Sequence, residues 1–186
     1  IGKLTVEALG IKVNVKAEDV SVTYDGKAHT ATQVSITSDG DFFNVDKVSY
    51  TAKKQSSTDV IEKTAIGYTA GDFTYTDTNL KVEFTVTDGS LEILPAEYWV
   101  ETESANKTYD GEPLTAPGTV KGLVEGETAE AVMTGTITNV GEETNSYNGV
   151  TWTTAKESNY WHNTEKDSIG KLTVEALGIK VNVKAE

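Results

Sequence analysis

The sequence predicts an all-β protein built from two small tandem β domains, sandwich-like or mixed-sheet modules arranged end to end. Three observations support this prediction. Several segments alternate apolar and polar residues with a period of two, which is typical of half-buried strands. No segment of ten or more residues has a convincing helical period. One eighteen-residue segment occurs twice without a change, and such self-similarity indicates a repeat architecture.

The alternating segments give the expected strands in chain order. Near the N-terminus, KLTVEA at 3–8 and IKVNVKA at 11–17 place apolar side chains opposite Lys, Thr, Glu and Asn. The same alternation occurs in KVEFTVT at 81–87, SLEIL at 90–94 and GVTWTT at 149–154. A Thr-Asp-Gly sequence ends the first of these three and predicts a turn of hairpin type before the second.

Two repeats divide the chain. The segment IGKLTVEALGIKVNVKAE fills residues 1–18 and again residues 169–186, so the period is 168 residues. A Tyr-Asp-Gly motif at 24–26 returns at 109–111, which is 109 − 24 = 85 residues later. Each period therefore contains two near-equal halves.

The phase of these repeats sets the expected domain boundaries. We expect a first β repeat domain at 10–95 and a second at 96–177. Residues 1–9 are expected to be the last strand of a preceding repeat, and residues 178–186 the first strand of the next repeat in a longer array. Alternatively, residues 1–18 complete an open sheet edge, in another molecule or in this one.

The repeated motif predicts a structural turn. An Asp carboxylate can accept a downstream backbone N–H, the following glycine tolerates positive φ, and the preceding tyrosine can bury its ring at the end of the sheet. We interpret the motif in this way rather than as a binding site. Its residues are Tyr24, Asp25, Gly26, Tyr109, Asp110 and Gly111.

Composition excludes several classes of function. The formal net charge is −13, and all sixteen positive charges are lysines because the sequence has no arginine. A nucleic-acid partner or an anionic membrane surface requires a basic stripe, which this composition cannot supply. The absence of cysteine excludes disulfides and thiolate metal sites. No apolar run approaches the roughly 20 residues of a membrane span, so we expect no membrane insertion by this segment.

No catalytic or cofactor-binding residues are predicted, and we do not expect an enzyme. A serine triad would have to use His29 or His162, and neither lies in a recognisable catalytic motif. We expect no metal site either. The oxygen-rich segment SDGDFFNVD, with Asp39, Asp41, Asn44 and Asp46, leaves calcium as an alternative to a solvated acidic loop. A Lys-Asn isopeptide bond is a second alternative, although the lysines of the alternating segments fall on the polar side.

Aromatic residues raise the main alternative to a purely structural role. Exposed rings can stack on sugars or anchor a protein partner. Tyr160 and Trp161 are the candidate ligand surface, whereas Trp152 and Trp99 are expected to fill the cores of small domains.

Several stretches resemble a known family. The paired YDG motifs, the stretch FTVTDGSLEILPAE and the stretch GLVEGETAEAVMTGTITNVGEETNSYNGVTW are similar to the MBG and YDG repeat domains of large bacterial surface proteins. The similarity is greater at 96–176 than in the first half of the chain. The resemblance implies a tandem extracellular module on the bacterial cell surface, and it implies no catalytic residue.

Residues and resemblance together give the expected function. We expect a structural repeat, a stalk or spacer of an adhesin-like protein, that projects a distal functional domain. Its expected partners are neighbouring repeats of the same polypeptide. The alternative is an adhesive binding module for a host glycan or protein.

Overall fold

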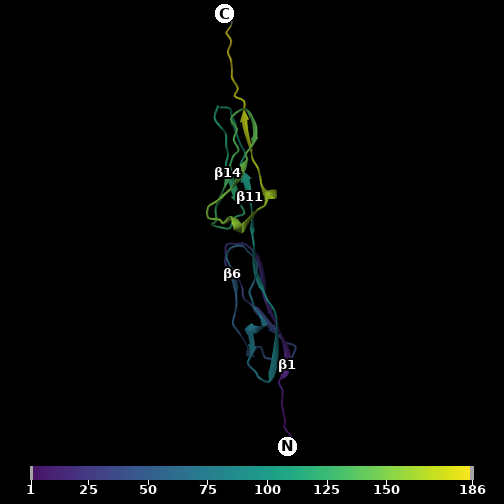
Figure 1. The fold of residues 1–186 in the computed structure, drawn as a ribbon. Helices are drawn as coiled ribbons and strands as arrows, with labels where there is room; N and C mark the ends of the chain where they lie inside the picture. Colours follow the sequence, from purple (N-terminus) through teal and green to yellow (C-terminus); the bar gives the residue numbers. More distant parts are fainter. Residues whose placement is uncertain (1, 185–186) are drawn as a thin grey trace. The chain divides into compact units, whose positions relative to one another are not determined.

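The computed structural model describes residues 2–184 (Figure 1). This part of the chain contains strands, turns and four short 3₁₀ helices, so the all-β prediction is confirmed. No helix within it is long and apolar enough to cross a membrane. The chain divides into two compact units, of which the first ends at Leu94 and the second begins at Pro95.

Unit 1 consists of short strands, two of which are preceded by one turn of 3₁₀ helix. In chain order its elements are β1 (Leu9–Ala17), β2 (Asp19–Thr23), β3 (His29–Ala31), β4 (Val34–Thr37), η1 (Val45–Lys47), β5 (Val48–Tyr50), β6 (Gln55–Ser57), β7 (Ile61–Ala65), η2 (Ala70–Asp72), β8 (Phe73–Tyr75), β9 (Leu80–Thr87) and β10 (Ser90–Leu94).

Strand β1 is the central strand of the first sheet of unit 1. It pairs in parallel with β9 and antiparallel with β4, in the order β4-β1-β9. Its alternate residues Ile11, Val13, Val15 and Ala17 are buried, and the lysines between them are exposed. Burial of a Val or Ile side chain contributes about 1.5–3 kcal/mol, so this apolar row holds β1 in its register.

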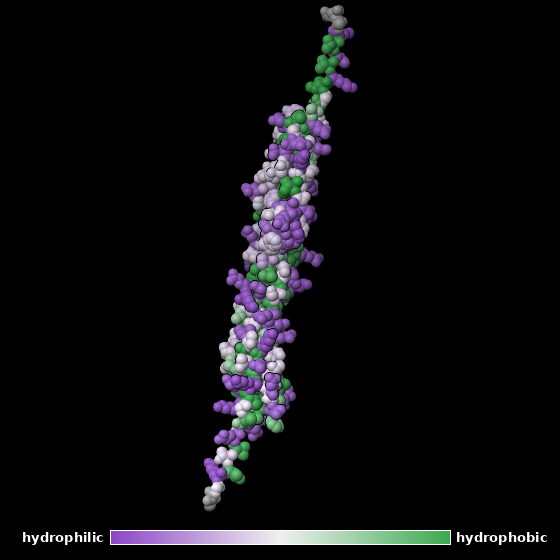
Figure 2. All heavy atoms as spheres, turned by 90° about the vertical axis from the view of Figure 1, so that its right-hand side faces the viewer, coloured by the Kyte–Doolittle hydropathy of each residue, from purple (hydrophilic) through white to green (hydrophobic). Residues whose placement is uncertain are grey.

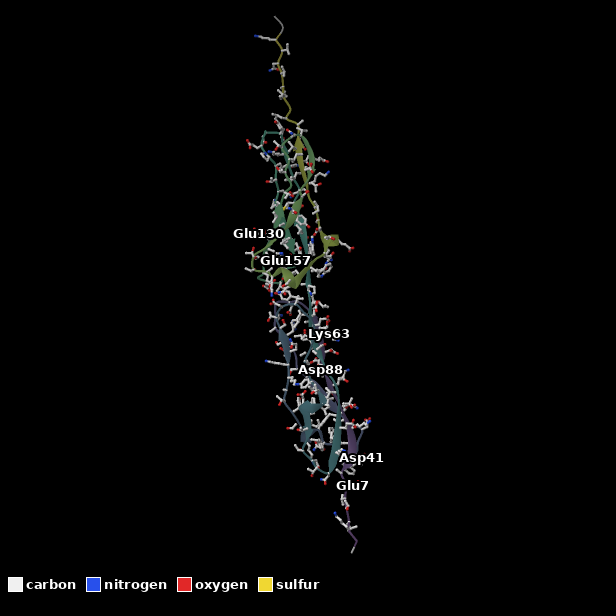
Figure 3. The ribbon with its side chains drawn as sticks, viewed as in Figure 1. Glu7, Asp41, Lys63, Asp88, Glu130 and Glu157 are labelled. Carbon is white, nitrogen blue, oxygen red and sulfur yellow. The ribbon has the colours of Figure 1, made fainter. Side chains whose placement is uncertain are left out.

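The second sheet of unit 1 has the order β2-β10-β7, with Leu91 and Ile93 of β10 fully buried. The hairpin predicted between 81–87 and 90–94 is wrong, because β9 and β10 join different sheets. The turn between β9 and β10 is held by hydrogen bonds to the segment that follows β7. The carboxylate of Asp88, labelled in Figure 3, accepts backbone N–H groups from Gly67 at 2.8 Å and Tyr68 at 3.0 Å.

Unit 2 also consists of short strands and short 3₁₀ helices. Its elements are β11 (Ala96–Thr102), β12 (Ala105–Thr108), β13 (Gly118–Lys121), β14 (Ala129–Met133), β15 (Gly141–Thr144), β16 (Tyr147–Trp152), η3 (Glu157–Asn159), β17 (Tyr160–His162), η4 (Thr164–Lys166) and β18 (Lys171–Glu175).

The sheets of unit 2 repeat the pairing scheme of unit 1. The order β13-β11-β17 matches β4-β1-β9, with one antiparallel and one parallel neighbour for the central strand. The order β12-β18-β15 matches β2-β10-β7 in the same way. Leu172 and Val174 of β18 occupy the fully buried positions that Leu91 and Ile93 occupy in β10. The faint sequence repeat therefore corresponds to a repeated topology.

One glycine in each unit lets the chain enter its last strand. A Cβ on Gly89 would lie 2.1 Å from the carbonyl oxygen of Glu18, and one on Gly170 would lie 2.3 Å from that of Glu103. No side chain fits at such distances. The two glycines directly precede β10 and β18, so the same backbone crossing occurs in both units.

In the first copy of the eighteen-residue segment the second half forms a strand, whereas in the second copy the first half does. Residues 2–8 lie outside any strand, while the identical residues 170–176 contain β18. Residues 9–16 lie in β1, while the identical residues 177–184 lie outside any strand. In Figure 1 both ends leave their own unit as single traces, and Figure 2 shows hydrophobic side chains exposed along them.

Candidate functional site

The Tyr-Asp-Gly motifs form two equivalent turns. Asp25 Oδ1 accepts the backbone N–H of Lys27 at 2.9 Å, and Asp110 Oδ1 accepts that of Glu112 at 3.0 Å. Gly26 and Gly111 follow with φ of 76° and 88°, in the left-handed region that side chains disfavour. Asp at one position and Gly at the next are thus required by the turn itself.

The tyrosine of each motif ties the turn to the last strand of its unit. The backbone N–H of Tyr24 donates to the carbonyl of Leu94 at 2.8 Å, and that of Tyr109 donates to the carbonyl of Glu175 at 2.8 Å. The rings differ, because Tyr24 is buried whereas Tyr109 is 39% exposed. The shared feature of the motif is therefore its backbone geometry.

Hydrogen bonds from different neighbours lower the pKa of both motif carboxylates. A hydrogen bond with His29, followed by the N–H of Lys27, holds the pKa of Asp25 below its ordinary value. A hydrogen bond from Lys107 has the same effect on the pKa of Asp110. Both interactions are local to a turn, so they support structure rather than chemistry.

A group of aromatic and polar side chains lies on the inner face of unit 2. Tyr98 of β11 stacks on His162 of β17 with ring centroids 4.7 Å apart and 11° between the planes. Trp152 of β16 meets Tyr98 edge-on at 5.1 Å and stacks on Tyr160 at 5.6 Å. Tyr98 and His162 can stack because they are in register in a parallel pair of strands.

The carboxylate of Asp167 forms hydrogen bonds with polar atoms of this group. Its carboxylate accepts the hydroxyl of Tyr147 at 2.6 Å, the N–H of Val100 at 2.8 Å and His162 Nε2 at 3.0 Å. Burial by itself raises the pKa of Asp167, but the hydrogen bonds from Tyr147, Val100 and His162 outweigh it and hold the pKa below its ordinary value. Burial and the bond to Asp167 raise the pKa of Tyr147.

The position of Asp167 follows from a difference between the units. In unit 1, β9 pairs with β1 without a break from Leu80 to Thr87. In unit 2 the corresponding strand β17 ends at His162, and η4 interrupts the ladder before Ser168 bridges to β11. The side chain of Asp167 accepts the Val100 N–H within this interruption. The Asp167 group therefore replaces lost strand pairing.

The structure places Tyr160 and Trp161, the predicted ligand surface, on opposite faces of β17. Neighbouring strand residues face opposite sides of a sheet, and Tyr160 is buried against Trp152 whereas Trp161 is 47% exposed. The hydroxyl of Tyr160 accepts the N–H of Val124 at 2.9 Å and donates to Glu127. Tyr160 is consequently a core residue, and Trp161 alone remains available to a ligand.

Trp99 shares the outer face with Trp161, contrary to the expectation that it fills the core. It lies on β11 two residues after Glu97, which is in register with Trp161. Its ring is half-buried because it packs on Gly122, where a Cβ would come within 2.7 Å, and because the Lys166 ammonium lies 5.0 Å from the ring centroid. The outer-face pair consists of Trp99 and Trp161, with Glu97 on the same face.

Alternation in the sequence indicates the outward position of each of these two tryptophans. In AEYWVET at 96–102, Ala96, Val100 and Thr102 are buried and Tyr98 alternates in phase with them, which leaves the tryptophan with the two glutamates on the polar side. In YWH at 160–162 the tryptophan is again the residue out of phase with its neighbours. The expectation that Trp99 is a core residue followed instead from the general tendency of large aromatic rings to be buried.

The histidines have protein partners in both units. His29 Nε2 lies 2.8 Å from Asp25 Oδ1, and His162 Nε2 is shared between Asp167 and the Tyr147 hydroxyl. These contacts join acids and a phenol, and within residues 2–184 no hydrogen bond links either imidazole to a serine or threonine hydroxyl. The arrangement does not provide an activated hydroxyl nucleophile.

In the acidic loop of unit 1, Asn44 has a structural role. Asn44 caps η1 by accepting the backbone N–H of Asp46 at 2.9 Å, which is an ordinary helix start. Within the described part of the chain, no group of three or more His, Asp or Glu side chains is placed to hold a metal ion.

Comparison with known proteins gives no relative. No protein-family model, no curated protein and no solved structure matches the chain.

Proposed function

We propose that this chain is a structural repeat, a stalk or spacer module of a bacterial cell-surface adhesin-like protein, and that it projects a distal functional domain. The observation that carries the proposal is the division of the duplicated segment. Residues 170–176 contain the last strand of unit 2, and residues 177–184 continue directly with the sequence of β1, the first strand of unit 1. Unit 2 of one period can thus be followed by unit 1 of the next.

The connections between units support this proposal. Only Pro95 separates β10, which ends at Leu94, from β11, which begins at Ala96. Only Ala176 separates β18 from Leu177, where the second copy of the β1 sequence begins. A one-residue connection cannot act as the long flexible linker that lets domains separate freely.

Independent cores in each unit also support a repeat. Each unit contains its own central strands and its own fully buried residues, Val13 and Leu91 in unit 1 and Val100 and Leu172 in unit 2. Stability in such arrays is a sum of unit and neighbour terms, so whole periods can be added without disturbing the others. The Tyr-Asp-Gly motifs act within this architecture as turns that receive the last strand of each unit.

Small-angle scattering on chains of one, two and four periods tests the spacer role. A spacer predicts that the maximum dimension increases by a constant amount for each added period. Chains with a ten-residue Gly/Ser insertion after residues 95 and 176 provide the control, because their flexible joints should reduce the increment. A maximum dimension that stops growing with added periods would contradict the proposal.

The exposed tryptophan favours a second function, an adhesive module for a host glycan or protein. Trp161 and Trp99 lie on one sheet face, and an exposed ring of this kind can stack on a sugar or anchor a partner. A glycan and host-protein array with the native chain and Trp161→Ala tests this alternative. Phe42→Ala, at a more exposed aromatic ring in unit 1, is the control. A hit that survives Trp161→Ala would exclude the tryptophan face.

A further inference from the structure

The C-terminal segment of the chain carries the sequence of a strand that is already folded in unit 1. Subtracting 168 from its residue numbers maps Ile179, Val181 and Val183 onto Ile11, Val13 and Val15 of β1. Val13 is fully buried, whereas Val181 is 78% exposed. In Figure 2 the apolar and polar side chains of this segment point to opposite sides, as in a strand that lacks its sheet.

We propose that residues 177–184 of one copy occupy the β1 position in unit 1 of a second copy whose own residues 9–17 are displaced from that position. The inference goes beyond the spacer role, because it concerns association between separate chains. It specifies the occupant as a second copy of this chain and the site as the space between β4 and β9.

The register of β1 defines the contacts that the incoming segment would make. Val13 pairs with Phe84, and Val15 lies between Val86 on one side and Ile36 on the other. Because the incoming residues are identical, Val181 and Val183 would make the same contacts with the same apolar surface. The exchanged and the original sheet then have equal local packing.

The connection to the donor also fits. The donor keeps Lys171–Glu175 in its own β18, and a single residue, Ala176, precedes the segment that enters the acceptor. The acceptor releases residues 9–17 together with residues 2–8, which belong to no strand before the exchange. No strand of the donor has to open.

The covalent connection between β1 and β2 determines when the exchanged state is populated. In the acceptor, β1 is joined to β2 through Glu18 alone, which gives it an effective concentration of about millimolar or more. A second chain at micromolar concentration therefore competes only where β1 is impaired. The resulting contact is head-to-tail, and a heterologous contact of this type propagates into open chains rather than closed dimers.

Matched substitutions in the two copies test the proposal. Val13→Asp/Val15→Asp places two carboxylates at buried positions of β1 and so vacates the site, while the C-terminal segment stays native. We expect this variant to form head-to-tail oligomers whose mass, measured by light scattering, rises with protein concentration. Amide hydrogen exchange should show β9 and β10 protected in the oligomers.

Two controls use the same substitutions. Val181→Asp/Val183→Asp alone should remain monomeric with native protection of unit 1, because these side chains are exposed. The quadruple variant should be monomeric, with the protection of β9 and β10 lost. If Val13→Asp/Val15→Asp stays monomeric at all concentrations, folded or unfolded in unit 1, the proposal is wrong. Equal association of the quadruple variant would also overturn it.

Disulfide trapping checks the register. The chain has no cysteine, and Asn14 is opposite Thr37 in the antiparallel pair of β1 and β4. In the Val13→Asp/Val15→Asp background, Asn182→Cys on one chain should therefore crosslink to Thr37→Cys on another. Ser35→Cys is the matched control, because it lies two residues, about 7 Å, out of register on the same side of β4.

The trapping result separates this inference from the proposed function. Crosslinking at Thr37 but not at Ser35 supports strand exchange. Equal crosslinking at both positions indicates non-specific association and overturns the inference. Either result leaves the scattering test of the spacer role intact, because that test uses periods joined in one chain.

Discussion

The two copies of the eighteen-residue segment have the same sequence and different structures. Leu4 is 99% exposed in the first copy, whereas the identical Leu172 is fully buried in β18 of the second. The relation reverses nine residues later, where Val13 is buried in β1 and Val181 is exposed. Alternation of apolar and polar residues therefore defines which face a strand would bury, but it does not make the strand.

The difference lies in the partners that each copy meets. β18 lies between β12 and β15, and β1 lies between β4 and β9, so each folded half is a central strand with two neighbours. Sheet propensity depends on packing against such neighbours more than on the backbone of the residue itself. A single segment thus contains two strands that belong to two different units.

The largest expected effect comes from Leu172→Ala, set against Leu4→Ala. Removal of a fully buried leucine side chain should lower the free energy of unfolding of unit 2 by about 2–5 kcal/mol. The same change at the exposed Leu4 should leave it unchanged within about 0.5 kcal/mol. Denaturant unfolding followed by tryptophan fluorescence measures both, because all three tryptophans belong to unit 2. Equal effects at the two positions would remove the comparison.

Gly170→Ala and Gly2→Ala apply the same test to the backbone. A Cβ on Gly170 would lie 2.3 Å from the Glu103 carbonyl, whereas none of the surroundings comes within 4 Å of one on Gly2. We expect a loss of about 1–3 kcal/mol from Gly170→Ala, because the chain must shift to relieve the overlap. Gly2→Ala should have no measurable effect in the same unfolding experiment. A neutral Gly170→Ala would mean that β18 does not need the close crossing.

Gly111→Val tests the turn that contacts the end of β18, the strand formed by the second copy. Tyr109 donates its N–H to Glu175 at the end of β18, and Gly111 holds the turn with a φ of 88°. A β-branched residue at positive φ is strained by about 1–2 kcal/mol, so unit 2 should unfold at lower denaturant concentration. Gly10→Val, at a glycine whose Cβ would meet nothing within 4 Å and whose φ is not positive, is the control. Unchanged stability would refute the turn geometry.

Much of the fold could be predicted from alternation. The segments expected at 11–17, 81–87 and 90–94 correspond to β1, β9 and β10 within two residues at each end. The segment at 149–154 overlaps β16. The segment at 3–8 has the same pattern and forms no strand. Alternation is local, whereas the decision between strand and tail rests on neighbours that are distant in sequence.

Pairing could not be predicted in the same way. β1 pairs in parallel with β9, about seventy residues later, and no turn motif marks such a contact. The Thr-Asp-Gly turn before β10 suggested a hairpin, but Gly89 serves a crossing between sheets. Among site residues, the phase of each strand indicates that Trp99 and Trp161 point outward, but their position on one face follows only from the pairing of β11 with β17. The clustering of Tyr147 and His162 on Asp167 depends on the interruption by η4, and the Asn163 cap that begins η4 does not identify these contacts from the sequence.

Asp167 provides the smallest expected effect, and it lies two residues before the second copy begins. Burial alone raises the pKa of Asp167, but hydrogen bonds from Tyr147, Val100 and His162 hold it below its ordinary value. Since the folded pKa lies below the unfolded one, the ionised carboxylate stabilises unit 2 above the ordinary value of about 3.9. That stabilisation is lost as the pH falls through the folded pKa.

Asp167→Asn should therefore flatten the acid dependence of unit 2, by about 1 kcal/mol between pH 6 and pH 2, because charged hydrogen bonds are stronger than neutral ones. Urea unfolding followed by tryptophan fluorescence at several pH values measures the difference between native and variant chains. Asp41→Asn, in the exposed loop of unit 1, should leave the acid dependence of unit 2 unchanged. Parallel curves for the native chain and Asp167→Asn would show that the carboxylate does not support the segment leading into β18.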